Sequence, residues 1–291
     1  MMDDIKRLEA IYRVTGRELR QLLLSASVRS SIGSGAVQVR VRNMVSDLNR
    51  AVDLWAADAI DLAYAKGAAK ARTSLQILGR RPMRGQTIDR PRILHDDLML
   101  TLIKANNSIP SIVDRFLATE QLAERAATEL DLSRAKVQEF SYSEAEDHIQ
   151  RIARNAVKQD ISRKSLTKRI LDYLRDLIGD DDFIEIGGRM YKMVSYAEMV
   201  GRTVLREAQT KATLDLCDQY DNDLVQVSDH NTDCEECEEY EGNIYSISGT
   251  NPDYPALEAE PPYHPRCMHS LLPTSEIAIQ SEKEFGLYQE E

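Results

Sequence analysis

The sequence predicts a mainly α-helical protein in which an elongated helical N-terminal region precedes a small α+β module stabilised by cysteine and histidine. Three observations lead to this fold class. Apolar residues recur at helical spacing through the first two-thirds of the 291 residues. Short β-prone segments gather after residue 180, and three of the four cysteines and three of the five histidines fall between residues 230 and 269. The expected division is a helical region with a basic loop (1–92), a second helical region (93–179), the C-terminal module (180–275) and an acidic tail (276–291).

The first helical segment is indicated by apolar residues from Ile5 to Leu23, and the serines and glycines of 30–35 predict a break after it. Val37, Val39 and Val41 alternate with polar residues, which is compatible with a short strand. The residues that follow recur at steps of three and four: Met44, Leu48, Val52, Trp55, Ala59 and Leu62. This stripe predicts one long helix that includes the valines, and it is typical of a packing seam.

The segment from Gly79 to Arg92 is predicted to be a loop, because it contains two prolines and two glycines. It carries one aspartate and five arginines: Arg80, Arg81, Arg84, Arg90 and Arg92. The loop is either a solvated connection or a contact for nucleic acid or an acidic partner, since arginine pairs with phosphate and carboxylate. Aromatic residues, which stack on bases, do not interleave with these arginines, so the nucleic-acid signal is weak.

From Ile93 to Ile178 the pattern is helical again, with an interruption near Asn106 and Asn107 and a helix end at Gly179. His95 and His148 stand alone in this stretch and are interpreted as surface or packing residues.

Strand signals begin beyond Asp180. Two β-prone arms between Phe183 and Met193 flank a Gly-Gly pair, which predicts a hairpin. Ser195 and Glu198 then match a capping box, so a helix is expected to begin there and to run to about Cys217. Cys217 is interpreted as a small buried hydrophobic residue. The β-branched segment from Leu224 to Ser228 predicts a strand.

The densest group of possible metal ligands follows this strand. His230, Cys234 and Cys237 are separated by 26 residues from His264, Cys267 and His269. Tetrahedral zinc needs four ligands, and Cys-x-x-Cys can aim two thiolates at one ion from a tight turn. We expect a structural zinc site formed by Cys234, Cys237, Cys267 and one or both of His264 and His269. His230 is either an alternative ligand or a residue that contacts a ligand.

The charges around the Cys-x-x-Cys pair favour metal over redox chemistry. Glu235 and Glu236 lie between the cysteines, and Glu238 and Glu239 follow. Negative neighbours disfavour a free thiolate, whereas a divalent cation reverses that balance. Two alternatives stay open: a reduced, metal-free site in which these side chains pack and hydrogen-bond, and a hydrolase that uses Cys267 with His264 or His269.

The net charge of −11 is concentrated in the same region. No Lys or Arg occurs between Lys211 and Arg266, whereas 218–260 contain thirteen carboxylates. Such a block repels nucleic-acid phosphates and argues against a DNA-reading zinc finger. It is either a solvated surface or a face for a basic protein partner. The sequence also predicts no transmembrane span and no secretory signal, and the few cysteines indicate a reducing compartment.

The C-terminal residues resemble a known family. The matching pieces, in order, are Val-Ser-x-His, Cys-x-x-Cys, Glu-Gly-x-x-Tyr-Ser-x-Ser-Gly, Tyr-Pro and His-Pro-x-Cys-x-His, preceded by the helix SYAEMVGRTVLREA. Over roughly 191–273 the chain resembles the phage minor capsid protein 2 family, related to the Mu-type head morphogenesis (minor head) proteins of tailed phages.

The resemblance implies a minor structural protein of a phage head, without enzymatic activity, acting in capsid assembly, portal association or DNA packaging and ejection. Expected partners are the portal and other head proteins, with packaged DNA contacted through the basic loop; no membrane or small-molecule substrate is expected. The protein would reside in the virion, and in the host cytoplasm during assembly. The main alternative is an intracellular zinc-stabilised module that binds proteins or nucleic acid.

Overall fold

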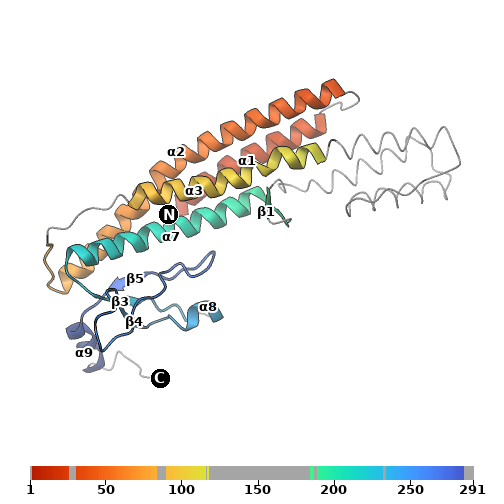
Figure 1. Ribbon diagram of the computed structural model, residues 1–291. Coiled ribbons are helices and arrows are strands. Elements are labelled where there is room, and N and C mark those ends of the chain that lie inside the picture. Colours follow the sequence, from red (N-terminus) through yellow and green to blue (C-terminus); the bar gives the residue numbers. More distant parts are fainter. Residues whose placement is uncertain are drawn as a thin grey trace, which may run out of the picture. The chain divides into compact units, whose positions relative to one another are not determined.

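The computed structural model describes residues 2–25, 31–83, 90–115, 117, 184–186, 189–231 and 234–284. Within these ranges the protein is mainly helical, which confirms the predicted fold class (Figure 1). The long helices are α1 (Met2–Ser25), α2 (Ser31–Ile77), α3 (Arg90–Asn106) and α7 (Met193–Gln219). The chain divides into two compact units: Ala10–Ala51 with Ile103–Tyr196, and Met1–Glu9 with Val52–Leu102 and Ala197–Glu291.

The unit formed by Ala10–Ala51 and Ile103–Tyr196 has an apolar core crossed by one polar network. Leu19, Val41 and Ile109 are buried, as the helical stripes predict. Tyr12 donates its hydroxyl hydrogen to Asn106 Oδ1 at 3.1 Å, and Asn106 Nδ2 donates to Asn49 Oδ1 at 2.7 Å. Burial raises the pKa of Tyr12. The network therefore satisfies polar groups that would be costly to bury alone.

The predicted hairpin is present in this unit. Strands β1 (Ile184–Ile186) and β2 (Arg189–Tyr191) pair antiparallel, with Ile186 opposite Arg189. That register leaves two residues for the turn, at the predicted Gly-Gly pair, which lies outside the described residues. Ser108 Oγ accepts the backbone N–H of Glu185 at 2.9 Å, and the Glu185 carboxylate pairs with Arg115.

In the other unit, α2 and α7 approach each other closely because glycine stands at the contact. A Cβ added to Gly67 would lie 2.7 Å from the Gln209 backbone. Trp55, which is 2% exposed, donates its indole N–H to the Asp4 carbonyl at 2.7 Å. In the predicted stripe Leu48, Val52, Trp55 and Ala59 are buried, as expected for a packing seam, whereas Leu62 is 44% exposed and does not belong to it.

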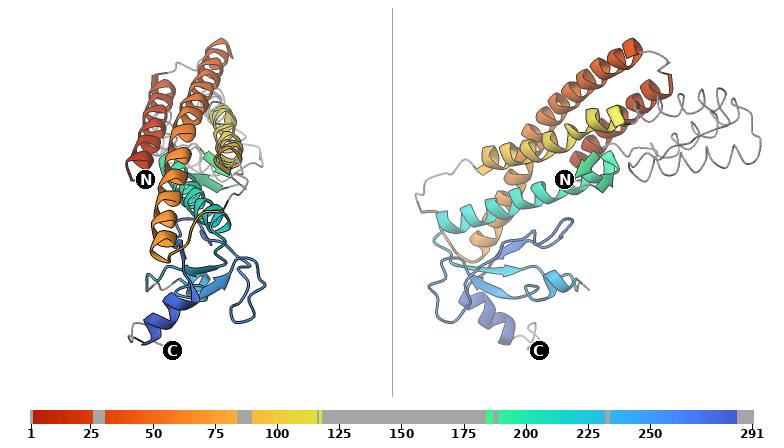
Figure 2. Two further views of the ribbon diagram at one scale, coloured as in Figure 1. Left: turned by 90° about the vertical axis from the view of Figure 1, so that its left-hand side faces the viewer. Right: turned by 45° about the vertical axis from the view of Figure 1, so that its right-hand side comes forward.

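A three-stranded antiparallel sheet forms the centre of the C-terminal module, with β3 (Leu224–Val227) between β4 (Ile244–Ser246) and β5 (Leu271–Pro273) (Figures 1 and 2). One face packs Val225, Val227 and Leu271 on Cys217, which confirms the expectation for that cysteine. On the other face Leu224 and Ile244 pack on Ile279 of α9 (Glu276–Glu284). Since the two faces bury apolar side chains from two helices, the small sheet is covered on both sides.

The junction between α7 and β3 is a Schellman motif. The N–H of Asn222 donates to the Cys217 carbonyl at 2.9 Å, and the N–H of Asp221 donates to the Asp218 carbonyl at 3.2 Å. Asp221 has a φ of 48°, the left-handed conformation that this motif requires at its C′ residue. The side chain of Asn222 then donates to the Leu224 carbonyl at 2.8 Å and fixes the start of the strand.

Three predicted boundaries are corrected. The break at 30–35 is wrong from Ser31 onward, where α2 begins; packing of buried Val37 and Val41 outweighs the cost of two glycines, about 1 kcal/mol each. The basic loop ends earlier than Arg92, because α3 begins at Arg90.

The capping box is also wrong, because α7 begins at Met193 and not at Ser195. Met193 is fully buried, which favours an earlier helix start. Glu198 instead accepts a hydrogen bond from Arg202 Nε at 2.8 Å.

Other expectations are confirmed or lie outside the described residues. The chain is helical from Arg90, with a turn at Asn107 at the predicted interruption. The helix ending at Gly179 and the position of His148 fall within 118–183, which are not described. The predicted domain boundaries stay predictions. No helix in the described ranges is long and apolar enough to span a membrane.

Candidate metal centre

Two tight turns of the C-terminal module present the sulfur and nitrogen donors. The first is the short helix α8 (Glu235–Glu238), for which Cys234 is the N-cap residue. The N–H groups of Cys237 and Glu238 both donate to the Cys234 carbonyl at 3.0 Å. One helical turn therefore places the two thiols of Cys-x-x-Cys on the same side.

The second turn runs from His264 to Cys267. The Cys267 N–H donates to the His264 carbonyl at 3.1 Å, and Arg266 has a φ of 71°. Proline at the second position and a positive φ at the third are features of a type II turn. This turn aims His264 and Cys267 at the thiols of the first turn.

The donor atoms of the two turns form two overlapping groups. In the outer group, His264 Nε2 lies 3.3 Å from Cys234 Sγ and 3.1 Å from Cys237 Sγ. In the inner group, Cys237 Sγ lies 3.9 Å from Cys267 Sγ, which is 3.4 Å from His269 Nδ1. Within each group all donor atoms lie within 4.8 Å of one another, and Cys237 belongs to both.

These separations match the edges of a zinc tetrahedron. Zn–S bonds of about 2.3 Å and Zn–N bonds of about 2.0 Å place sulfur atoms about 3.8 Å apart, and sulfur about 3.5 Å from nitrogen. The donor set of thiols and imidazoles is also the one that zinc prefers. Five of the six expected ligands are therefore brought together in a way that could hold a metal ion.

Both histidines present the correct nitrogen to the sulfurs. Nδ1 of His264 lies 2.8 Å from the Pro265 carbonyl, and Nε2 of His269 lies 3.0 Å from Glu241 Oε1. Because a carbonyl and a carboxylate only accept, these nitrogens carry the hydrogen, and in a neutral ring the other nitrogen offers a lone pair. Metal-ligating histidines are oriented in the same way.

His230, the sixth candidate, belongs to neither group. Its Nε2 lies 2.9 Å from Ser228 Oγ, and its ring packs edge-on against His269 with centroids 5.0 Å apart. Its backbone N–H donates to Glu241 Oε1, the oxygen that also contacts His269. The structure thus places His230 beside a candidate ligand.

The surroundings of Cys237 keep its thiol protonated when no metal is bound. Burial, together with the neighbouring Cys267 and Cys234, raises the pKa of Cys237 to about 12. A protonated buried thiol is a poor nucleophile, so this environment argues against cysteine catalysis at Cys237. A bound cation would displace the protons and stabilise the thiolates.

Two buried hydrogen-bond donors lack a partner among the described residues, Arg206 Nε and the Tyr263 hydroxyl. Burial lowers the pKa of Arg206 and raises the pKa of Tyr263.

The other candidate contact residues are not part of this centre. Arg80, Arg81 and Arg92 are exposed, whereas Arg84 and the side chain of Arg90 lie outside what the structure describes. His95 Nε2 lies 3.0 Å from Asp53 Oδ1, in agreement with a surface or packing role.

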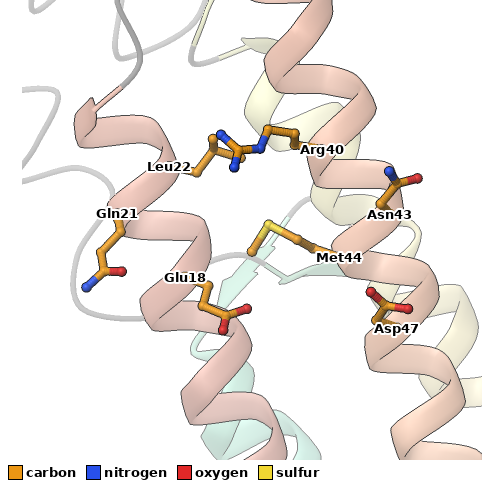
Figure 3. Close-up of a pocket in the computed structure, with 7 residues that line it drawn as sticks. All are labelled: Glu18, Gln21, Leu22, Arg40, Asn43, Met44 and Asp47. Atoms are coloured by element: carbon orange, nitrogen blue, oxygen red, sulfur yellow. The ribbon is translucent and has the colours of Figure 1, made fainter.

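A groove of about 790 Å³ runs between α1 and α2 (Figure 3). It is lined by Glu18, Gln21, Leu22, Arg40, Asn43, Met44 and Asp47. The lining mixes apolar groups with both signs of charge, and it contains no cysteine or histidine.

Glu241 and Asp223 are site residues that the sequence interpretation missed. Glu241 is one of five glutamates in 235–241, and nothing in the spacing separates it from the others. The Asp223 carboxylate accepts from Ser246 Oγ at 2.6 Å and from the Ser248 N–H at 2.7 Å. The Tyr-Ser-x-Ser-Gly motif was a signal for such a contact, since it places two serines at the end of a strand.

The motif residues all lie in the C-terminal module. The same segment matches a protein-family model. Residues 178–273 match the model of the family described as phage minor capsid protein 2. The module is similar to that family. This confirms the resemblance expected from the sequence and indicates a structural role in a phage head. Comparison with curated proteins and with solved structures gives no match.

Proposed function

We propose that the protein is a minor structural component of a tailed-phage head that acts in capsid assembly, portal association or DNA packaging and ejection. The observation that carries this proposal is the match of residues 178–273 to the phage minor capsid protein 2 family. The protein would be incorporated into the virion after assembly in the host cytoplasm.

The roles of the signature residues support a docking module and not a catalytic one. Ser246 and Ser248 bind Asp223, and Glu241 binds His269. Gly242 and Gly249 have φ angles of 73° and 67°, which glycine adopts without strain. Because these residues are used to build the loops, no nucleophile–base pair is required to explain the signature.

Zinc is the ion proposed for the Cys/His centre, in a structural role. The module has a three-stranded sheet and two small apolar clusters, and small domains often need a metal to fold. Elemental analysis of the purified protein, with Cys234→Ser/Cys237→Ser as control, should find zinc in the wild type alone.

The proposed partners follow from the charge distribution. The acidic segment 218–260 suits a basic surface on the portal or another head protein. The exposed Arg80 and Arg81 suit an acidic protein surface or the phosphates of packaged DNA. A DNA contact predicts affinity that falls steeply with salt, and a weaker salt dependence when Arg80, Arg81 and Arg84 are neutralised.

Mass spectrometry of purified virions from the source phage tests the central claim, and co-purification with the tagged portal protein tests portal association. We expect the chain in mature heads and in the portal fraction. Heads that contain no trace of the chain would refute the head role, whereas presence in heads without portal co-purification would refute portal association alone.

A further inference from the structure

The two overlapping donor groups contain different histidines: His264 lies in the outer group and His269 in the inner group. A single zinc takes four ligands, yet five donor atoms are gathered, and Cys237 is shared. The groups differ in burial: all three residues of the inner group are buried, whereas Cys234 and His264 of the outer group are partly exposed. Burial limits the access of solvent to a ligand and to the ion, which favours the inner group.

The second difference is the partner that holds each histidine. His264 contacts the carbonyl of Pro265, the residue next to it, so this contact adds no constraint from elsewhere in the fold. His269 contacts the carboxylate of Glu241, and their side chains are only 3% and 11% exposed. A buried carboxylate both fixes the imidazole tautomer and strengthens the ring as a metal ligand.

Glu241 is itself fixed by the backbone. Its Oε1 accepts the N–H of His230, in the loop that follows β3. His269 stands two residues before β5, which pairs with β3. The Glu241–His269 contact is therefore tied to the central strand and to one outer strand of the sheet. The contact fixes the position of the imidazole in the absence of a metal ion.

We infer that one zinc ion is held by Cys234, Cys237, Cys267 and His269, and that Glu241 is the positioning residue that orients His269. Cys234, the N-cap residue of α8, belongs to the outer group and supplies the fourth ligand, because its thiol lies within 4.8 Å of the shared Cys237 thiol. His264, whose Nε2 contacts the thiols of Cys234 and Cys237, gives up these contacts when the ion binds. The inference rests on the zinc centre proposed above and is independent of the role in the phage head.

The test measures zinc content and zinc affinity of the full chain, by elemental analysis and competition with a chromogenic chelator. Cobalt is substituted to report the ligand set by absorption. We expect one ion per chain, His269→Ala to bind at least about 100-fold more weakly, and His264→Ala to stay within a few-fold of wild type. Glu241→Gln should bind 10–100-fold more weakly with an unchanged cobalt spectrum, because the ligands remain. Glu238→Gln, which changes the exposed last residue of α8, is the matched control and should bind like wild type.

The outcomes separate the two claims. If the wild-type chain binds neither zinc nor cobalt, the proposal of a metal centre is refuted. A chain that binds zinc but loses it in His264→Ala and not in His269→Ala overturns only the ligand assignment. Two ions per chain, bridged by Cys237, would also overturn it. Since Glu241→Gln keeps an acceptor oxygen and all ligands, it tests the positioning role even if His269→Ala fails to fold.

Discussion

Individual residues of the module adopt backbone conformations that their side chains do not favour. Asp221 holds a φ of 48° at the C′ position of the Schellman motif after α7. The left-handed conformation costs a non-glycine residue roughly 1–2 kcal/mol, and a carboxylate at a helix C-terminus faces the negative end of the dipole. The backbone strain and the unfavourable charge–dipole interaction both occur at the turn that positions β3.

Asp221→Gly should therefore raise the free energy of unfolding, by about 1 kcal/mol. Urea denaturation followed by circular dichroism measures the change. Asp218→Gly is the matched control: it removes the same charge, but at a helical residue of α7, where glycine costs about 0.5–1 kcal/mol. Equal effects of the two substitutions would show that charge, and not backbone strain, dominates.

Asp223 gives the module a predictable response to acid. Burial raises the pKa of its carboxyl, but the hydrogen bonds from Ser246 and Ser248 outweigh this, so the pKa is lowered from its ordinary value. A carboxyl whose pKa is lowered by folding contributes stability above its unfolded pKa, and this is lost as pH falls through the folded value.

Asp223→Asn should consequently destabilise the protein by about 2 kcal/mol near pH 7, because charge-assisted hydrogen bonds are weakened. The difference from wild type should shrink as the pH falls from about 4 toward 2. Thermal unfolding measured across that range provides the check, and a difference that is constant with pH would contradict the carboxylate role.

At the scale of elements, helix contacts depend on glycines whose purpose the sequence does not reveal. Gly67→Ala should destabilise the protein by about 1–3 kcal/mol, because the added Cβ would meet the Gln209 backbone at 2.7 Å and force α2 and α7 apart. Gly35→Ala is the control within the same helix. Nothing lies within 4 Å of a Cβ at Gly35, so alanine should stabilise the protein by about 0.5–1 kcal/mol. Chemical denaturation of both variants measures this, and changes of the same sign would contradict the close-contact argument.

Only part of the fold and of the site could be predicted from the sequence. Apolar spacing located α1, α2 and α3, and the β-branched run located β3, because these patterns report burial directly. Helix starts were misplaced where burial of Val37, Val41 and Met193 overrides the local preference of serine and glycine. In the site, residue type and spacing identified five gathered donors, since metal ligands are few in kind. The Glu241–His269 and Asp223–Ser246 contacts join distant segments, and no local spacing encodes them.

For the molecule as a whole, zinc should determine the stability of the C-terminal module more than that of the long helices. The helices carry extensive apolar cores, whereas the two Cys/His turns lie within loops of 228–243 and 247–270. An ion that binds only the folded form stabilises it by about 4 kcal/mol at a free concentration 1,000 times its Kd. Removing zinc with a chelator should therefore speed amide hydrogen exchange in 224–273 at least tenfold and leave α1 to α3 nearly unchanged.

Hydrogen exchange measured by mass spectrometry, with and without chelator, makes this comparison within one protein. Cys234→Ser/Cys237→Ser serves as control, because it should exchange rapidly in 224–273 under both conditions. If the wild-type module exchanged equally slowly after its zinc was removed, the sheet and its two apolar clusters would suffice to hold the fold. The metal would then have to be explained by a role other than stability. The expected result is the opposite, because the sheet has only three short strands and the sulfur-bearing turns contribute few apolar side chains to its two clusters.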